Sequence, residues 1–172
     1  GSSRTDPVAS CAEENLLCYP GDPYNTENIM IHEFAHAIHL NGIYDVDTTF
    51  DKRLGKIYKA AMAKGLWKSK YAAKNKAEYW AEGVQSWFNS NRPPDHDHNH
   101  IDTREELKEY DPGLANLVGE IFGDTVWRYK RPSQRKSPGH LQGFDPLKTP
   151  IFKWPKELND FYLKHIREQN KA

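Results

Sequence analysis

The stretch from Asn28 to Asn41 constrains this chain most, because residues 32–36 read His-Glu-Phe-Ala-His. In a helix of about 3.6 residues per turn, histidines four positions apart lie one above the other on one face. Two imidazoles placed in this way can bind one zinc ion, and Glu33 is carried beside the metal as a general base. The alternative is a helix that buries His32 and His36 beside a glutamate without any compensating cation, which is costly. We therefore predict a zinc-binding helix.

A catalytic zinc ion needs a third protein ligand besides the two histidines. In the metzincin pattern a glycine would stand at position 39 and a histidine at position 42. This chain has His39 and Gly42 at these positions, which excludes that class. We interpret His39 as a structural histidine or one that supports a ligand, with metal ligation as the alternative.

Two glutamates on a later predicted helix are better candidates for the missing ligand. Glu78 and Glu82 are four residues apart, so both face the same way. Carboxylates among the aromatic residues of this segment are costly to bury unless a positive group lies opposite. We predict that Glu78 binds the metal and that Glu82 accepts a hydrogen bond from a ligand imidazole, which fixes its tautomer. A solvated acidic face is the alternative.

These two blocks together resemble the gluzincin zinc metallopeptidases, the thermolysin-like class with two histidines and a glutamate. The likeness is greatest to the catalytic domain of anthrax lethal factor, which has a similar His-Glu-Phe-x-His helix and a similar segment to residues 75–82, Asn-Lys-Ala-Glu-Tyr-Trp-Ala-Glu. It covers about residues 27–88. That domain also has a tyrosine seven residues before the ligand glutamate, and here this position is Tyr71. The resemblance implies that Tyr71 donates its hydroxyl to the oxyanion or to the leaving amine.

Hydrophobic periodicity and capping residues predict a mainly helical chain. The resemblance implies that the fold is an α+β fold of the zincin type with a small sheet. We expect helices over about residues 28–41, 50–64, 75–89, 103–110, 111–123 and 155–169. The first should be capped by Asn25 or Thr26 and should stop at Gly42. Zincin domains place a sheet before the metal helix, and here only residues 15–19 and 125–130 could supply strands. We expect a catalytic domain over 4–130, with 131–172 as its extended arm and docking helix.

Composition limits the partners that we expect. The formal net charge is zero and no apolar run approaches the roughly 20 residues that span a bilayer. We therefore expect a monomer that acts on a peptide or protein, without nucleic acid and without a membrane span. A disulfide between Cys11 and Cys18 is favoured over free thiols, and it would indicate a secreted or periplasmic protein.

The function that we predict is zinc-dependent hydrolysis of a peptide bond, with His32, His36 and Glu78 as ligands, Glu33 as base and Tyr71 as donor. One alternative is a non-catalytic, zinc-stabilised binding module that uses the basic C-terminal arm. Another is hydrolysis of a different amide by the same site. The loop that contains His96, His98 and His100 is either a solvated polar loop or a second metal site.

Overall fold

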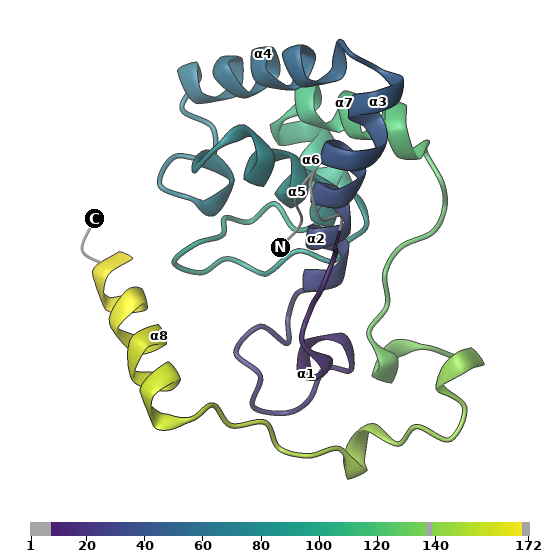
Figure 1. The fold of residues 1–172 in the computed structure, drawn as a ribbon, viewed down its shortest axis with the longest axis vertical. Coiled ribbons are helices and arrows are strands. Elements are labelled where there is room, and N and C mark those ends of the chain that lie inside the picture. Colours follow the sequence, from purple (N-terminus) through teal and green to yellow (C-terminus); the bar gives the residue numbers. More distant parts are fainter. Residues whose placement is uncertain (1–7, 137–138, 170–172) are drawn as a thin grey trace.

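The computed structural model describes residues 8–136 and 139–169, and within these ranges all regular structure is helical (Figure 1). The expected small sheet is therefore wrong for the described residues, although the mainly helical class is confirmed. Residues 15–19 instead belong to α1 (Glu13–Leu16) and the turn after it. Residues 125–130 are irregular: buried Arg104 donates to Thr125 O at 2.8 Å, and the Tyr129 N–H donates to Phe88 O at 2.8 Å. No helix in the described ranges is long and apolar enough to cross a membrane.

Helix α5 (Lys76–Trp87) lies among the other core helices, α2, α4, α6 and α7 (Figure 1). It begins where predicted, because the Asn75 side chain accepts hydrogen bonds from the backbone N–H groups of Ala77 and Glu78. Every residue from Tyr79 to Trp87 is buried, and the helix packs against α2, α4, α6 and α7. An element surrounded on all sides is held rigidly, which suits a helix that carries the candidate ligand Glu78.

Helix α2 (Ile29–Ala37) carries the histidine motif, but both of its predicted boundaries are wrong. Its N-cap is Asn28, whose side chain accepts from the backbone N–H of Ile31. At the other end the chain does not stop at Gly42, because that glycine does not adopt the left-handed conformation of a C-cap. The chain continues as a π-helical segment, η1 (Ile38–Ile43), and then as α3 (Tyr44–Val46).

Three further helices close the core as the sequence predicts. These are α4 (Phe50–Ala63), α6 (Arg104–Tyr110) with its capping box of Thr103 and Glu106, and α7 (Pro112–Phe122), which ends at Gly123. Asp111 lies between α6 and α7: its carboxylate caps α7 and also accepts hydrogen bonds from Trp67 Nε1 at 2.9 Å and Tyr79 Oη at 2.6 Å. This buried carboxylate holds α5 and α7 in register.

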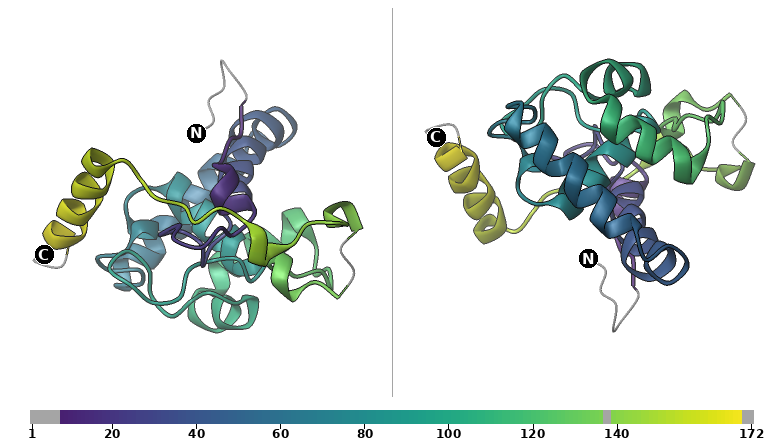
Figure 2. Two further views of the ribbon diagram at one scale, coloured as in Figure 1. Left: turned by 90° about the horizontal axis from the view of Figure 1, so that it is seen from below. Right: turned by 90° about the horizontal axis from the view of Figure 1, so that it is seen from above.

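The C-terminal arm ends in helix α8 (Lys156–Gln169), which lies to the side of the helical body (Figure 2). Only part of its predicted docking face is used. Tyr162 packs against Tyr24 and Trp154, with ring centroids 5.7 and 5.0 Å apart, whereas Leu158 and Phe161 are exposed. The short 3-10 turns η3 (Pro132–Gln134), η4 (Gly139–Leu141) and η5 (Pro146–Lys148) lie within the arm.

The two cysteines do not form the predicted disulfide. Cys11 and Cys18 are both free thiols. The turn after α1 directs Cys18 Sγ toward the carbonyl of Asn15 at 3.7 Å and the hydroxyl of Tyr129 at 3.8 Å. The secreted or periplasmic location expected from the disulfide stays a prediction.

Candidate metal centre

The start of α2 is held in place by a buried side chain from α1. The Asn15 side chain accepts from the backbone N–H of Ile29 at 2.9 Å and donates to the carbonyls of Tyr24 and Glu27 at 2.8 and 3.2 Å. Asn15 thereby connects α1, the loop after it and the first turn of α2. The position of His32, one turn further along, is fixed as a result.

Three candidate ligands meet at one point between α2 and α5. His32 Nε2 and His36 Nε2 lie 3.1 Å apart, and Glu78 Oε2 lies 3.0 Å from the first and 3.2 Å from the second. The two imidazole rings stand nearly edge to face, with centroids 4.8 Å apart. The structure thus brings together the three residues that the sequence predicts as metal ligands.

These distances fit a zinc site. Ligand atoms about 2.0–2.1 Å from a tetrahedral zinc ion stand about 3.3 Å from one another, close to the 3.0–3.2 Å found here. Without a cation, two ring nitrogens and a carboxylate oxygen converge on one point, and any protons that they carry are crowded together there. With a cation, all three offer lone pairs to one centre. Histidine nitrogen and carboxylate oxygen are also the ligand types of catalytic zinc.

The surroundings favour positive charge at this cluster. Burial lowers the pKa of His32, but its hydrogen bonds to Glu78 and Glu82 outweigh burial and raise that pKa to about 10. For Glu78, burial raises the pKa, and hydrogen bonds from His32 and His36 more than reverse it, so its pKa lies far below the usual value. The metal-free cluster therefore holds a proton that a metal ion would replace.

The far side of His32 is supported by two residues, of which the sequence predicted one. His32 Nδ1 lies 2.8 Å from Gln85 Oε1 and 3.4 Å from Glu82 Oε1. Gln85 is fully buried, and its amide nitrogen donates to Glu27 and to the carbonyl of Asn28, which orients its oxygen toward the imidazole. Gln85 thus makes a closer contact with His32 than Glu82, the residue that the sequence predicts for this role. Its position, seven residues after Glu78 and so on the same helix face, was the available signal.

Glu33 and Tyr71 both line a cavity of about 240 Å³ beside His32. Tyr71 belongs to the short turn η2 (Tyr71–Ala73) before α5, and its ring centroid is 6.2 Å from that of His32. Burial, reinforced by the nearby carboxylates of Glu78, Glu82 and Glu33, raises the pKa of Tyr71 above its usual range. The hydroxyl therefore keeps its proton and can act as a hydrogen-bond donor.

The histidine-rich loop closes one wall of this cavity, and it is not simply a solvated loop. His98 is buried and lies 3.4 Å from Glu82 Oε2 and 2.9 Å from Asp95 Oδ1. Its neighbour His96 is also largely covered, whereas His100 is exposed. Burial alone would lower the pKa of His98. The Glu82 carboxylate outweighs burial and raises that pKa to about 9. Glu82 thus lies between two imidazoles.

His39 lies away from the metal cluster. It is buried on the π-helical segment, where its Nε2 is 3.2 Å from Asp51 Oδ1 and its ring packs against Phe50 and Trp80. Burial lowers its pKa, despite the neighbouring Asp51. This arrangement agrees with the interpretation of His39 as a structural histidine.

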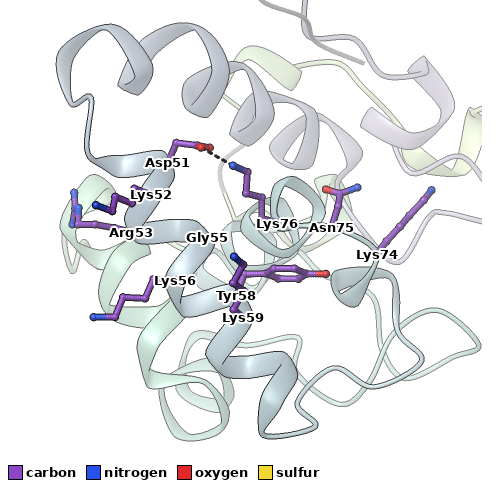
Figure 3. Close-up of a pocket in the computed structure, with 10 residues that line it drawn as sticks. All are labelled: Asp51, Lys52, Arg53, Gly55, Lys56, Tyr58, Lys59, Lys74, Asn75 and Lys76. Atoms are coloured by element: carbon purple, nitrogen blue, oxygen red, sulfur yellow. Dashed lines mark hydrogen bonds and ion pairs between the residues drawn. The ribbon is translucent and has the colours of Figure 1, made fainter.

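A second hollow, of about 830 Å³, lies between α4 and the start of α5 and contains none of the predicted site residues (Figure 3). Its cations are Lys52, Arg53, Lys56, Lys59, Lys74 and Lys76. Lys76 is bonded to Asp51, as the dashed line in Figure 3 marks. This basic surface is separate from the metal cluster.

The comparisons with known proteins add no relative to this description. No family model, no curated protein and no solved structure matches the chain, so its family remains a prediction from the motifs.

Proposed function

We propose that this protein is a zinc-dependent metallopeptidase of the gluzincin type. The observation that carries the proposal is the triangle of His32 Nε2, His36 Nε2 and Glu78 Oε2, with sides of 3.0–3.2 Å, beside a cavity that Glu33 and Tyr71 line. Structural zinc sites usually have four protein ligands, whereas catalytic sites have three and keep one position open. The three-ligand cluster favours catalysis over a zinc-stabilised binding module.

The chemistry that zinc supplies when bound is polarisation of the scissile carbonyl and a lowered pKa of water. His32, His36 and Glu78 would hold the ion. Glu33, on the wall of the cavity, takes a proton from the attacking water and delivers it to the leaving nitrogen. Tyr71, protonated at neutral pH, donates a hydrogen bond to the oxygen on which negative charge develops.

The residues behind the ligands preserve this arrangement. Gln85 and Glu82 both accept at Nδ1 of His32, which directs Nε2 toward Glu78. Ligand imidazoles commonly have such an acceptor, which fixes the tautomer and strengthens the donor nitrogen. Because Gln85 and Glu82 are buried on the rigid helix α5, His32 has little freedom to turn.

Replacement of Glu33 by glutamine tests the proposal. We expect Glu33→Gln to retain one zinc at this cluster and to lose about 10²–10⁴-fold in turnover, the usual contribution of a general base. The substrate is a diverse peptide library, digested with and without a chelator and read by mass spectrometry. Glu109→Gln, which changes an exposed glutamate of α6, is the matched control and should cleave like the wild type.

Three results would contradict the proposal. Full activity of Glu33→Gln would remove the glutamate base from the mechanism. Zinc bound by the wild type without cleavage of any peptide would instead favour the binding module, and cleavage of other amide compounds alone would favour a non-peptide substrate.

A further inference from the structure

The loop over residues 95–98 has a defined conformation in which Asp95 is central. Asp95 Oδ1 accepts from the backbone N–H groups of Asp97 and His98 at 2.9 and 2.8 Å. Lys70 Nζ donates to the carbonyl of Asp95 at 2.8 Å, which ties the loop to the segment before η2. The side chains of His96 and Asp97 are therefore presented from a fixed backbone.

Helix α8 brings a third potential ligand to this loop. His96 Nε2 lies 3.0 Å from Asp97 Oδ2, and His165 Nε2 on α8 lies 3.9 Å from the same oxygen. One ligand atom from each of the three residues lies within 4.8 Å of the others. Behind His96, Asp95 Oδ2 is 3.8 Å from Nδ1, where ligand histidines commonly have a carboxylate partner.

The set consists of two imidazoles and one carboxylate, a combination that suits zinc and similar divalent transition metals. Its spacing is wider than the roughly 3.3 Å between the ligands of one zinc ion, so one residue must move closer. His165 can do so, because its side chain is 45% exposed, whereas that of His96 is 9% exposed. The loop thus presents two ligands, His96 and Asp97, from a fixed backbone, and α8 supplies the third, His165.

Helix α8 has few apolar contacts that could hold it in this place. Tyr162 packs against Tyr24 of the N-terminal loop, whereas Phe161 is 72% exposed and Leu158 is 56% exposed. In Figure 1 the helix follows a long extended segment and stands beside the body. A metal ion between loop and helix would supply an attachment that the apolar contacts supply only in part.

We propose that His96, Asp97 and His165 form a second metal site, which takes a divalent transition-metal ion such as Zn²⁺ and fastens α8 to the loop over residues 95–98. Asp97 and His165 also line the cavity beside His32, so the fastened helix covers one side of that cavity. The site shares no ligand with the cluster of α2 and α5, and it does not depend on peptidase activity.

Metal stoichiometry tests the site. The full chain is stripped with a chelator, loaded with Zn²⁺, desalted and measured by elemental mass spectrometry. We expect two equivalents for the wild type and one for His165→Ala. His100→Ala, which changes the exposed histidine of the same loop, should keep two. Glu78→Gln weakens the first cluster, and it should retain the equivalent at the second, so failure of one site is distinguishable from failure of the other.

Hydrogen exchange tests the fastening of α8. Zn²⁺ should slow exchange of the α8 amides at least severalfold in the wild type and in Glu78→Gln, but not in His165→Ala. Two equivalents of zinc in His165→Ala would overturn the site. Loss of one equivalent without any zinc effect on α8 exchange would overturn its role in attaching the helix.

Discussion

Gln85 supplies the sharpest test of the metal centre, because it contacts the candidate metal ligand His32 without being a candidate ligand itself. In Gln85→Leu the side chain keeps much of its bulk but loses the oxygen 2.8 Å from His32 Nδ1. Loss of such a partner typically costs 10–100-fold in metal affinity, or about 1.4–2.7 kcal/mol. Glu82 Oε1, at 3.4 Å, remains as a weaker acceptor. We therefore expect the lower end of that range, about a tenfold loss of zinc affinity.

The assay is competition for zinc with a chromophoric chelator at fixed pH. Tyr79→Phe is the control, since it removes a buried 2.6 Å hydrogen bond to Asp111 from the same helix but touches no ligand. That variant should lose stability and keep its zinc affinity. The reasoning is refuted if the affinity of Gln85→Leu stays within twofold of the wild type, or if Tyr79→Phe weakens zinc binding equally.

Four further outcomes follow from packing and charge. A Cβ on Gly83 would lie 2.5–2.7 Å from Leu114, so Gly83→Ala should destabilise the protein by about 1–3 kcal/mol in urea unfolding. In contrast, Gly55→Ala meets nothing within 4 Å on α4 and should stabilise by about 0.5–1 kcal/mol. Asp111→Ala leaves two buried donors and the start of α7 without their acceptor, which should cost at least about 3 kcal/mol in the same assay. The zinc-free protein should lose thermal stability as the pH rises from about 6.5 to about 10. The folded state raises the pKa of His32 to about 10, so the stabilising effect of its bound proton is lost across this range. Calorimetric melts with and without zinc measure this loss.

Each of these has a contrary result that is easy to recognise. Equal effects of Gly83→Ala and Gly55→Ala would mean that the contact between α5 and α7 is looser than described. A fully stable Asp111→Ala would show that water replaces the carboxylate. Stability of the zinc-free protein that stays constant up to pH 10 would place the proton elsewhere than on His32.

The helices could be predicted wherever local signals are strong. The caps at Asn75, Thr103 and Asp111 stand where the predicted helices begin, because capping depends on residues within one turn. The errors arise where contacts between residues far apart in the sequence determine the local structure. The start of α2 is held by Asn15 of α1, and in the expected strand over residues 125–130 the Thr125 carbonyl accepts from the buried Arg104 side chain, while the Tyr129 N–H donates to the Phe88 carbonyl.

The candidate ligands could be predicted because each pair is spaced along a single helix. His32 with His36, and Glu78 with Glu82, obey helix geometry, and only their approach to each other required the tertiary fold. Gln85 was missed because nothing in the sequence ranks it above Glu82 as the partner of His32. The approach of His165 to Asp97 links residues 68 positions apart, which no local pattern reveals.

The complete burial of α5 between Tyr79 and Trp87 has a consequence for how this protein can diversify. The helix holds much of the core, and it also carries the candidate ligand Glu78 and the two residues behind His32, so substitutions there cost stability, and those at Glu78, Glu82 and Gln85 also change metal affinity. Latitude for substitution therefore lies elsewhere, at exposed positions of α8 such as Leu158 and Phe161, because this helix borders the cavity without forming the core. Selection for a new substrate would act first on these exposed positions, and α5 would stay nearly invariant among any descendants that keep the fold.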